Sequence, residues 1–187
     1  MQIKNHRLTD ISQISSPNCN PRFDETDISL IVIHNISLPP QQFGGDYITQ
    51  LFCNCLNPNE HPYFKEIYQL KVSAHLLIRR NGDVIQYVPF HQRAWHAGKS
   101  LYQGRERCND FSIGIELEGA DNIPYTQAQY LKLAAVIQLL IQHYPQLNKE
   151  RITGHSDVAP ERKTDPSVSF LWSKLFQLLE TGVETSI

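Results

Sequence analysis

The sequence has no long hydrophobic run. Its apolar stretches all fall well short of the ~20 residues that a membrane-spanning helix needs, so we expect no membrane partner. The N-terminal segment MQIKNHRLTDISQISS is polar and lacks the apolar centre of a signal peptide. We therefore expect the protein to act in the cytoplasm.

Charge of one sign is not in excess either. The 17 lysines and arginines nearly balance the 19 aspartates and glutamates, which leaves a formal net charge of −2. Such a chain presents no overall positive field to a polyanion. We therefore expect no nucleic-acid partner.

Cysteine is sparse, and the sequence also lacks internal repeats and low-complexity segments. The four cysteines are Cys19, Cys53, Cys55 and Cys108. Without a signal peptide they are expected to be reduced thiols. A soft-metal site at Cys53-x-Cys55 is the weaker alternative, because no second cysteine pair completes the four ligands of a structural zinc site.

What the sequence does contain is typical of one globular domain. A chain of 187 residues with 41% hydrophobic and 19% charged residues can bury one core and is short for two. We expect a single domain over residues 1–187 and a monomer.

Three segments have the pattern of strands. Residues 28–34, ISLIVIH, form a nearly unbroken β-branched run that is typical of a strand buried on both faces. Residues 72–88 contain an Asn81-Gly82 turn between β-prone runs, which predicts a hairpin. Residues 111–119, FSIGIELEG, alternate apolar and polar residues, which predicts a half-buried strand with its carboxylates on a polar face.

Helices are predicted in the C-terminal half. Thr126 and Gln129 have the spacing of a capping box before an amphipathic helix that ends at Pro145. A second helix is predicted over about 169–181. Residues 36–70, rich in proline and glycine, are predicted to form a long surface excursion. Together these elements predict an α/β domain with one central sheet.

The stretch TGHSDVAPERKTDP, residues 153–166, brings a histidine, a lysine and an aspartate into one loop. Catalytic zinc takes three protein ligands and keeps a fourth position open. His155 and Asp165 supply two candidates, and His34 at the polar end of the 28–34 strand is a third. Each residue alone fits a structural role as well: a hydrogen-bonded histidine at a strand end, or an aspartate that shapes a turn before proline.

Two further positions stay open at this point. Glu116 and Glu118 alone are better explained as a solvated strand face than as catalytic groups. His96, in the stretch AWHAG, either lines a cleft or braces a turn. The other five histidines have the surroundings of structural residues.

Four segments resemble one enzyme family: IVIHNISLPP, SAHLLIRRNGDVIQYVPF, RAWHAGKSLYQGRERCNDFSIGIELEG and TGHSDVAPERKTDP. They are similar, in order and over most of the chain, to AmpD-type anhydro-N-acetylmuramoyl-L-alanine amidases. The wider zinc amidase family includes phage amidases and peptidoglycan recognition proteins. The resemblance implies their fold, a mixed central sheet flanked by helices. It also implies hydrolysis of the amide between 1,6-anhydro-N-acetylmuramic acid and L-alanine in bacterial cytosolic peptidoglycan recycling.

Transferred residue by residue, the resemblance implies that Zn²⁺ is bound by His34, His155 and Asp165. It implies that Glu116 and Lys163 are the catalytic pair. Glu116 would move a proton from water to the leaving amine, and Lys163 would stabilise the oxyanion. Lytic relatives often have cysteine as the third ligand and tyrosine in place of Glu116, so Asp165 and Glu116 favour the recycling enzymes.

The same resemblance suggests residues that hold the muropeptide. Trp95 offers a flat face for the sugar, Lys71 and Arg107 are candidates for peptide carboxylates, and Asn35 for an amide contact. Solvated cations and a core tryptophan are the structural alternatives. The chain departs from the family at Lys71, where arginine is expected, and at Ser167, where the family commonly has glycine after Asp-Pro.

Two rival functions share parts of this pattern. A lytic amidase that acts on intact cell wall has the same chemistry but needs an export route or a wall-binding module. A recognition protein that binds muropeptides without cleaving them normally lacks a zinc ligand, whereas all three ligand positions are filled in this chain.

Overall fold

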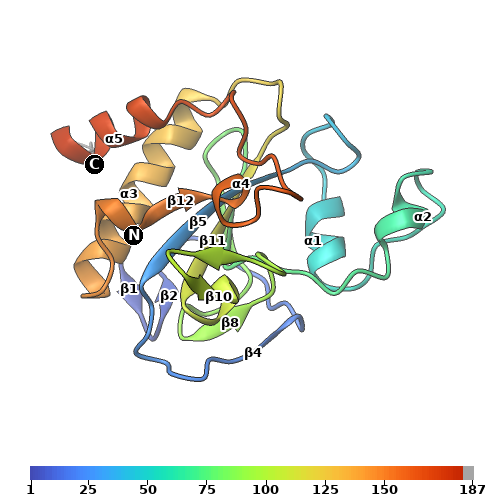
Figure 1. The fold of residues 1–187 in the computed structure, drawn as a ribbon. Coiled ribbons are helices and arrows are strands. Elements are labelled where there is room, and N and C mark those ends of the chain that lie inside the picture. Colours follow the sequence, from blue (N-terminus) through green and yellow to red (C-terminus); the bar gives the residue numbers. More distant parts are fainter. Residues whose placement is uncertain (183–187) are drawn as a thin grey trace.

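A six-stranded mixed sheet lies at the centre of the molecule (Figure 1). The structure, a computed structural model, describes residues 1–182. In spatial order the strands of this sheet are β12 (Ile152–Gly154), β5 (Leu30–Ile36), β11 (Ser112–Glu118), β6 (Leu76–Ile78), β7 (Val84–Gln86) and β3 (Ser12–Gln13). The first four are parallel, β7 is antiparallel to β6, and β3 is parallel to β7. The predicted α/β class is confirmed.

Two helices, α3 (Gln127–His143) and α5 (Trp172–Thr181), pack on one face of this sheet (Figure 1). The apolar side chains of α3 alternate with the helical period and meet those of the central strands. The main core between them contains Ile33 of β5, Ile115 of β11, and Leu133, Ile137 and Leu140 of α3.

The ends of these helices follow local signals. Helix α3 begins with the predicted capping box, in which the Thr126 side chain accepts a hydrogen bond from the Gln129 backbone N–H. Helix α5 begins three residues later than the predicted segment and ends at Thr181, directly before Gly182.

The remaining elements are short. Helix α4 (His155–Val158) follows β12 directly. Three small antiparallel pairs flank the sheet: β1 (Ile3–Lys4) with β2 (Arg7–Leu8), β4 (Cys19–Pro21) with β8 (Gln92–Ala94), and β9 (Leu101–Tyr102) with β10 (Arg105–Glu106). Single 3-10 turns cover Cys108–Asp110 and Lys149–Arg151. No helix within residues 1–182 is long and apolar enough to cross a membrane.

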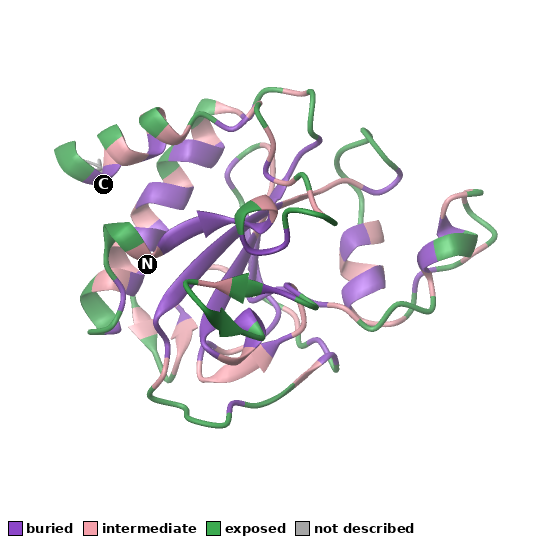
Figure 2. Cartoon of the chain, viewed as in Figure 1, coloured by how far each residue is buried: buried purple, intermediate pink, exposed green. Residues whose placement is uncertain are grey.

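The strand predicted over 111–119 is present as β11, but its environment was predicted wrongly. It lies inside the sheet between β5 and β6, and Figure 2 shows these central strands as buried. Glu118 is only 2% exposed, and its carboxylate accepts from the backbone N–H groups of Gly44 and Arg80. The polar face is therefore covered by other segments. Alternation in the sequence could not reveal this, because hydrogen-bonded carboxylates and solvated ones have the same pattern.

Residues 37–70 contain no strand and only two short helices, α1 (Tyr47–Phe52) and α2 (Phe64–Ile67). They lie to the side of the sheet (Figure 1). The excursion nevertheless has its own apolar cluster, in which Leu51, Phe52 and Phe64 pack with Tyr87 and Val88. Its longest exposed run is residues 40–46.

Candidate active site

Three neighbouring strands place His34, Glu116 and His155 at one level of the sheet. In the parallel register, Glu116 of β11 pairs with His34 of β5, and Gly154 of β12 pairs with Ile33. His155 directly follows Gly154, so it lies at the level of His34. Because side chains alternate along a strand, His34 and Glu116 lie on the face opposite Ile33 and Ile115, away from the helical core. This is the carboxyl end of the parallel strands, where α/β proteins commonly place their sites.

His34, His155 and Asp165 converge. The Nδ1 atoms of the two histidines are 2.9 Å apart, and Asp165 Oδ2 lies 3.2 Å from His34 Nδ1 and 3.0 Å from His155 Nδ1. Their side chains are 2%, 4% and 13% exposed, respectively. No other group of three potential ligands within residues 1–182 is this close together.

The donor set fits zinc. Ligand atoms about 2.0–2.2 Å from a shared tetrahedral ion are roughly 3.3–3.6 Å apart, only slightly more than the separations in this cluster. Burial lowers the pKa of His34 to about 4, which leaves a neutral imidazole. Burial alone would raise the pKa of Asp165, but its close contacts with His155 and His34 outweigh burial and hold the pKa below its usual value. Neutral imidazole and ionised carboxylate are the forms that bind a metal.

Glu116, on β11, faces a cavity that His155 and Asp165 also line. Its Oε2 atom is enclosed and is one of three buried side-chain polar atoms without a hydrogen-bond partner among the described residues. Burial, and then the nearby charge of Asp165, raise the pKa of Glu116 well above its ordinary value, while Lys163 opposes this. A carboxyl group with a raised pKa and a free oxygen is suited to exchange protons near neutral pH.

Lys163 and Asp165 both line the cavity, as expected if positions two apart point to one side. Thr164, between them, does not line the cavity, and its Oγ1 donates to Asp121 Oδ2. The loop is held to the start of α4 because the Ser156 N–H donates to the Asp165 carbonyl. The segment that follows α4 therefore presents a cation beside a candidate metal ligand.

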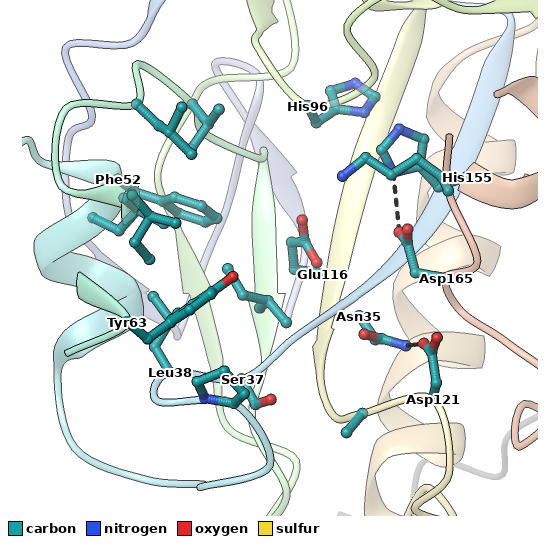
Figure 3. Close-up of a pocket in the computed structure, with 18 of the residues that line it drawn as sticks. Asn35, Ser37, Leu38, Phe52, Tyr63, His96, Glu116, Asp121, His155 and Asp165 are labelled. Atoms are coloured by element: carbon teal, nitrogen blue, oxygen red, sulfur yellow. Dashed lines mark hydrogen bonds and ion pairs between the residues drawn. The ribbon is translucent and has the colours of Figure 1, made fainter. Parts of the chain in front are cut away.

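The cavity has a volume of about 710 Å³ and two chemically different walls (Figure 3). One wall is apolar and comes largely from the excursion, with Leu38, Phe52 and Tyr63. The other is polar, with Asn35, Asp121, Glu116, His155 and Asp165. Such a cavity suits a ligand that has both an apolar part and hydrogen-bonding groups.

The four predicted substrate-binding residues are not all in this cavity. Asn35 and Trp95 line it. The Asn35 amide donates to Asp121, and the Trp95 indole donates to Asn20. Lys71 is exposed and does not line the cavity, although its neighbour Val72 does.

Arg107 lies on a different hollow, with Leu101 and Pro160, and its guanidinium pairs with Asp110 at 3.1 Å. The structure thus brings Asn35 and Trp95, but not Lys71 or Arg107, to the cavity that His155 and Asp165 line. Their role in binding a peptide carboxylate stays a prediction.

Sequence reasoning missed Tyr63 and Asp121, which both line the cavity. Tyr63 belongs to the excursion, where no periodic pattern marks one residue. Asp121 follows β11 and binds both Asn35 and Thr164, a role that only the folded chain makes visible. His96, left open by the sequence, lines the cavity.

Comparisons with known proteins show the family of this chain. Residues 24–168 match the family described as N-acetylmuramoyl-L-alanine amidase. The chain is 55% identical over 187 residues to the 1,6-anhydro-N-acetylmuramyl-L-alanine amidase AmpD of Enterobacter cloacae, covering 100% of both chains. A crystal structure of a selenomethionine AmpD derivative superposes with a TM-score of 0.93 at 55% identity, covering 96% of this chain and 99% of that one.

A more distant structure is a complex of AmiD from E. coli with anhydro-N-acetylmuramic acid-L-Ala-D-γ-Glu-L-Lys. It is 28% identical with a TM-score of 0.60, and covers 91% of this chain and 60% of that one. The fold and these matches define the class: the protein is an enzyme of the α/β class that hydrolyses an amide bond. The chain belongs to the N-acetylmuramoyl-L-alanine amidase family, which confirms the resemblance found in the sequence.

Proposed function

We propose that this protein hydrolyses the amide bond between 1,6-anhydro-N-acetylmuramic acid and L-alanine in muropeptides, and that it does so during peptidoglycan recycling in the bacterial cytoplasm. The observation that carries the chemistry is the convergence of His34, His155 and Asp165 beside Glu116. The full-length identity to AmpD enzymes supports the substrate.

The metal in this proposal is Zn²⁺, which His34, His155 and Asp165 would hold. When bound, Zn²⁺ supplies a Lewis acid that polarises the amide carbonyl and makes a water molecule more acidic. Two neutral histidines and one carboxylate leave a net positive charge on such a site. The other steps depend on side chains of the protein itself.

Glu116 is the proposed general base and acid. Its enclosed oxygen has no partner among the described residues, so it is free to accept a proton from the attacking water. Its raised pKa then lets the same carboxyl group return that proton to the leaving amine. Glu116 lies on the polar wall of the cavity (Figure 3), where both transfers would take place.

Lys163 is the proposed oxyanion stabiliser. Its ammonium group has no carboxylate within 4.0 Å among the described residues, so its charge is not neutralised by an ion pair. A cation in this position interacts more strongly with the tetrahedral oxyanion than with the neutral amide, which lowers the barrier.

The two walls suggest how a muropeptide is held. Trp95 and the apolar wall offer surface to the anhydro sugar, and Asn35 offers an amide group to the peptide. Lys71 and Arg107 remain proposed contacts for carboxylates at the distal end of the peptide. A small muropeptide is the only partner that the proposal requires, and the proposed active unit is a monomer.

Turnover of two substrates tests this proposal against its lytic rival. The purified chain with zinc should release free stem peptide from an anhydromuropeptide and should act far more slowly on intact sacculi. Mass spectrometry of the products gives both rates. Comparable rates on the two substrates would favour a lytic amidase, and tight binding without turnover would favour a recognition protein.

A further inference from the structure

His96 contacts the ligand His34 on the side away from the cluster. His34 Nε2 lies 2.9 Å from His96 Nδ1, and the two rings are nearly perpendicular, at 88°. His96 follows β8 and lines the same cavity as His155 (Figure 3). None of the catalytic roles described above uses this residue.

The hydrogen bond between Ser112 and the Cys108 carbonyl determines which atom donates in the bonds that lead from His96 to His34. Ser112 Oγ lies 2.6 Å from the Cys108 carbonyl, which only accepts, so the hydroxyl hydrogen is used there. Ser112 Oγ must then accept from His96 Nε2, at 3.1 Å. A neutral imidazole that donates from Nε2 accepts at Nδ1. His96 Nδ1 therefore accepts from the N–H at His34 Nε2.

This arrangement decides which nitrogen of His34 is free. With its proton on Nε2, His34 presents a lone pair at Nδ1, the atom that faces His155 and Asp165. The second histidine is oriented in the same way, since His155 Nε2 lies 3.3 Å from the Ala97 carbonyl and can only donate to it. Residues 96 and 97 thus orient both histidines.

The segment that does this is itself fixed. The buried Asn109 side chain accepts from the backbone N–H groups of His96 and Ala97, at 3.1 and 2.8 Å. Gly114 of β11 makes room for the His96 ring, because a Cβ at this position would lie 2.4 Å from His96 Cγ. The ring is held against the sheet from several sides.

We propose that His96 is a positioning residue that holds His34 in its metal-binding tautomer through the chain His34, His96, Ser112 and the Cys108 carbonyl. This role rests on the proposed metal centre. Partners behind a metal-binding histidine typically change metal affinity by roughly 10–100-fold.

The test compares zinc affinity with the stability of the metal-free protein. His96→Ala should raise the zinc Kd by about 10–100-fold in competition with a chromophoric chelator. His75→Ala is the matched control, since His75 is buried beside His96, 5.9 Å between ring centroids, but makes no hydrogen bond to His34. It should lower the Tm of the metal-free protein while leaving the zinc Kd within about threefold of wild type, below the range for a lost partner of a ligand.

Two more variants separate positioning from packing. His96→Asn places an oxygen where Nδ1 was, so it should recover most of the lost affinity. Ser112→Ala leaves the ring but removes its acceptor, so nitrogen-15 NMR of the metal-free protein should show His34 losing its preference for the proton on Nε2. This last variant also serves if His96→Ala does not fold.

An unchanged zinc Kd in His96→Ala, or an unchanged His34 tautomer in Ser112→Ala, would refute the positioning role. Equal losses of affinity in His96→Ala and His75→Ala would refute it too, because they would indicate general destabilisation. A wild-type protein that binds no zinc would refute the metal centre itself, and that result is distinguishable from failure of the positioning role alone.

Discussion

At the residue scale, the side chains of the proposed centre differ in what their removal takes away. Asp165→Ala removes an anionic ligand, so zinc affinity and activity should fall together. Lys163→Ala should keep zinc and lose about 10²–10³ in kcat, the range for a lost oxyanion donor. Glu116→Ala should also keep zinc and lose about 10² or more. Zinc stoichiometry beside kcat measures all three.

Lys149→Ala is the control, since Lys149 is an exposed lysine away from the cavity. It should leave both quantities unchanged. Near-normal turnover in Lys163→Ala or Glu116→Ala, or tight zinc binding in Asp165→Ala, would show that the corresponding role is misassigned.

Ser167 is the position at which the chain departs from the family's usual glycine. Its φ of 72° lies in the left-handed region, which costs a non-glycine residue about 1 kcal/mol. The Ser167 hydroxyl donates to the Asp121 carbonyl at 2.5 Å, which offsets part of this cost. Ser167→Ala should therefore lower the free energy of unfolding by about 1 kcal/mol, as measured by urea denaturation.

Ser167→Gly is the companion variant. It loses the hydroxyl but relieves the backbone strain, so its free energy of unfolding should stay within about 0.5 kcal/mol of wild type. If glycine destabilised the protein as much as alanine does, the strain would not be relevant to stability.

Spacing and resemblance in the sequence both point to residues that the structure brings close together. His34, His155 and Asp165 do converge, and Glu116 is at the predicted level of the sheet. Asp121 could not be predicted, because its importance comes from contacts with Asn35 and Thr164 that are distant in sequence.

At the scale of elements, the excursion and the central strand should differ in local stability. Residues 40–46 are exposed, whereas β11 is hydrogen-bonded on both sides by β5 and β6. Amide hydrogen exchange in the excursion should therefore be faster than in β11. Exchange over residues 40–46 as slow as over 112–118 would contradict this difference in local stability.

Glu118 of β11 forms a hydrogen bond that connects the excursion to the sheet. One carboxylate oxygen accepts from Gly44 of the excursion at 2.6 Å, and the other accepts from Arg80. Glu118→Gln keeps only one accepting oxygen, so one of these N–H groups loses its partner. Exchange near residue 44 or 80 should speed up by about tenfold, as expected for a lost bond of about 1.4 kcal/mol to a charged group, while exchange in α3 should not change.

The elements themselves were largely predictable. The Asn81-Gly82 turn and the Thr126 capping box are local signals, and both are present. The burial of Glu118 was not predictable, because it depends on where a distant loop lies. Local patterns thus determined the elements, whereas the covering of each face depended on long-range packing.

At the scale of the whole molecule, buried histidines should make the protein sensitive to acid. Burial, and then the charge of Arg22, lower the pKa of His75 to about 3, against 6.5 as its ordinary value. The unfolded chain therefore binds a proton below pH 6.5 that the folded chain does not bind until about pH 3. The stability that His75 contributes is present above pH 6.5 and is lost as the pH falls through this window.

His75→Asn removes this titration and keeps an oxygen that can accept from the Gly114 N–H. Between about pH 6 and about pH 4, its free energy of unfolding should fall less steeply than that of wild type, by roughly 1 kcal/mol per pH unit. Urea denaturation of the metal-free proteins at several pH values measures both slopes. Parallel slopes would mean that His75 is not the titrating group.

The central claim is that three side chains from distant parts of the chain hold the zinc on which catalysis depends. Its most direct test is the rate of anhydromuropeptide hydrolysis by full-length protein before chelation, after verified removal of metal, and after addition of one equivalent of Zn²⁺. If this claim holds, activity disappears with the metal and returns with it. Full activity in verified metal-free protein would contradict it.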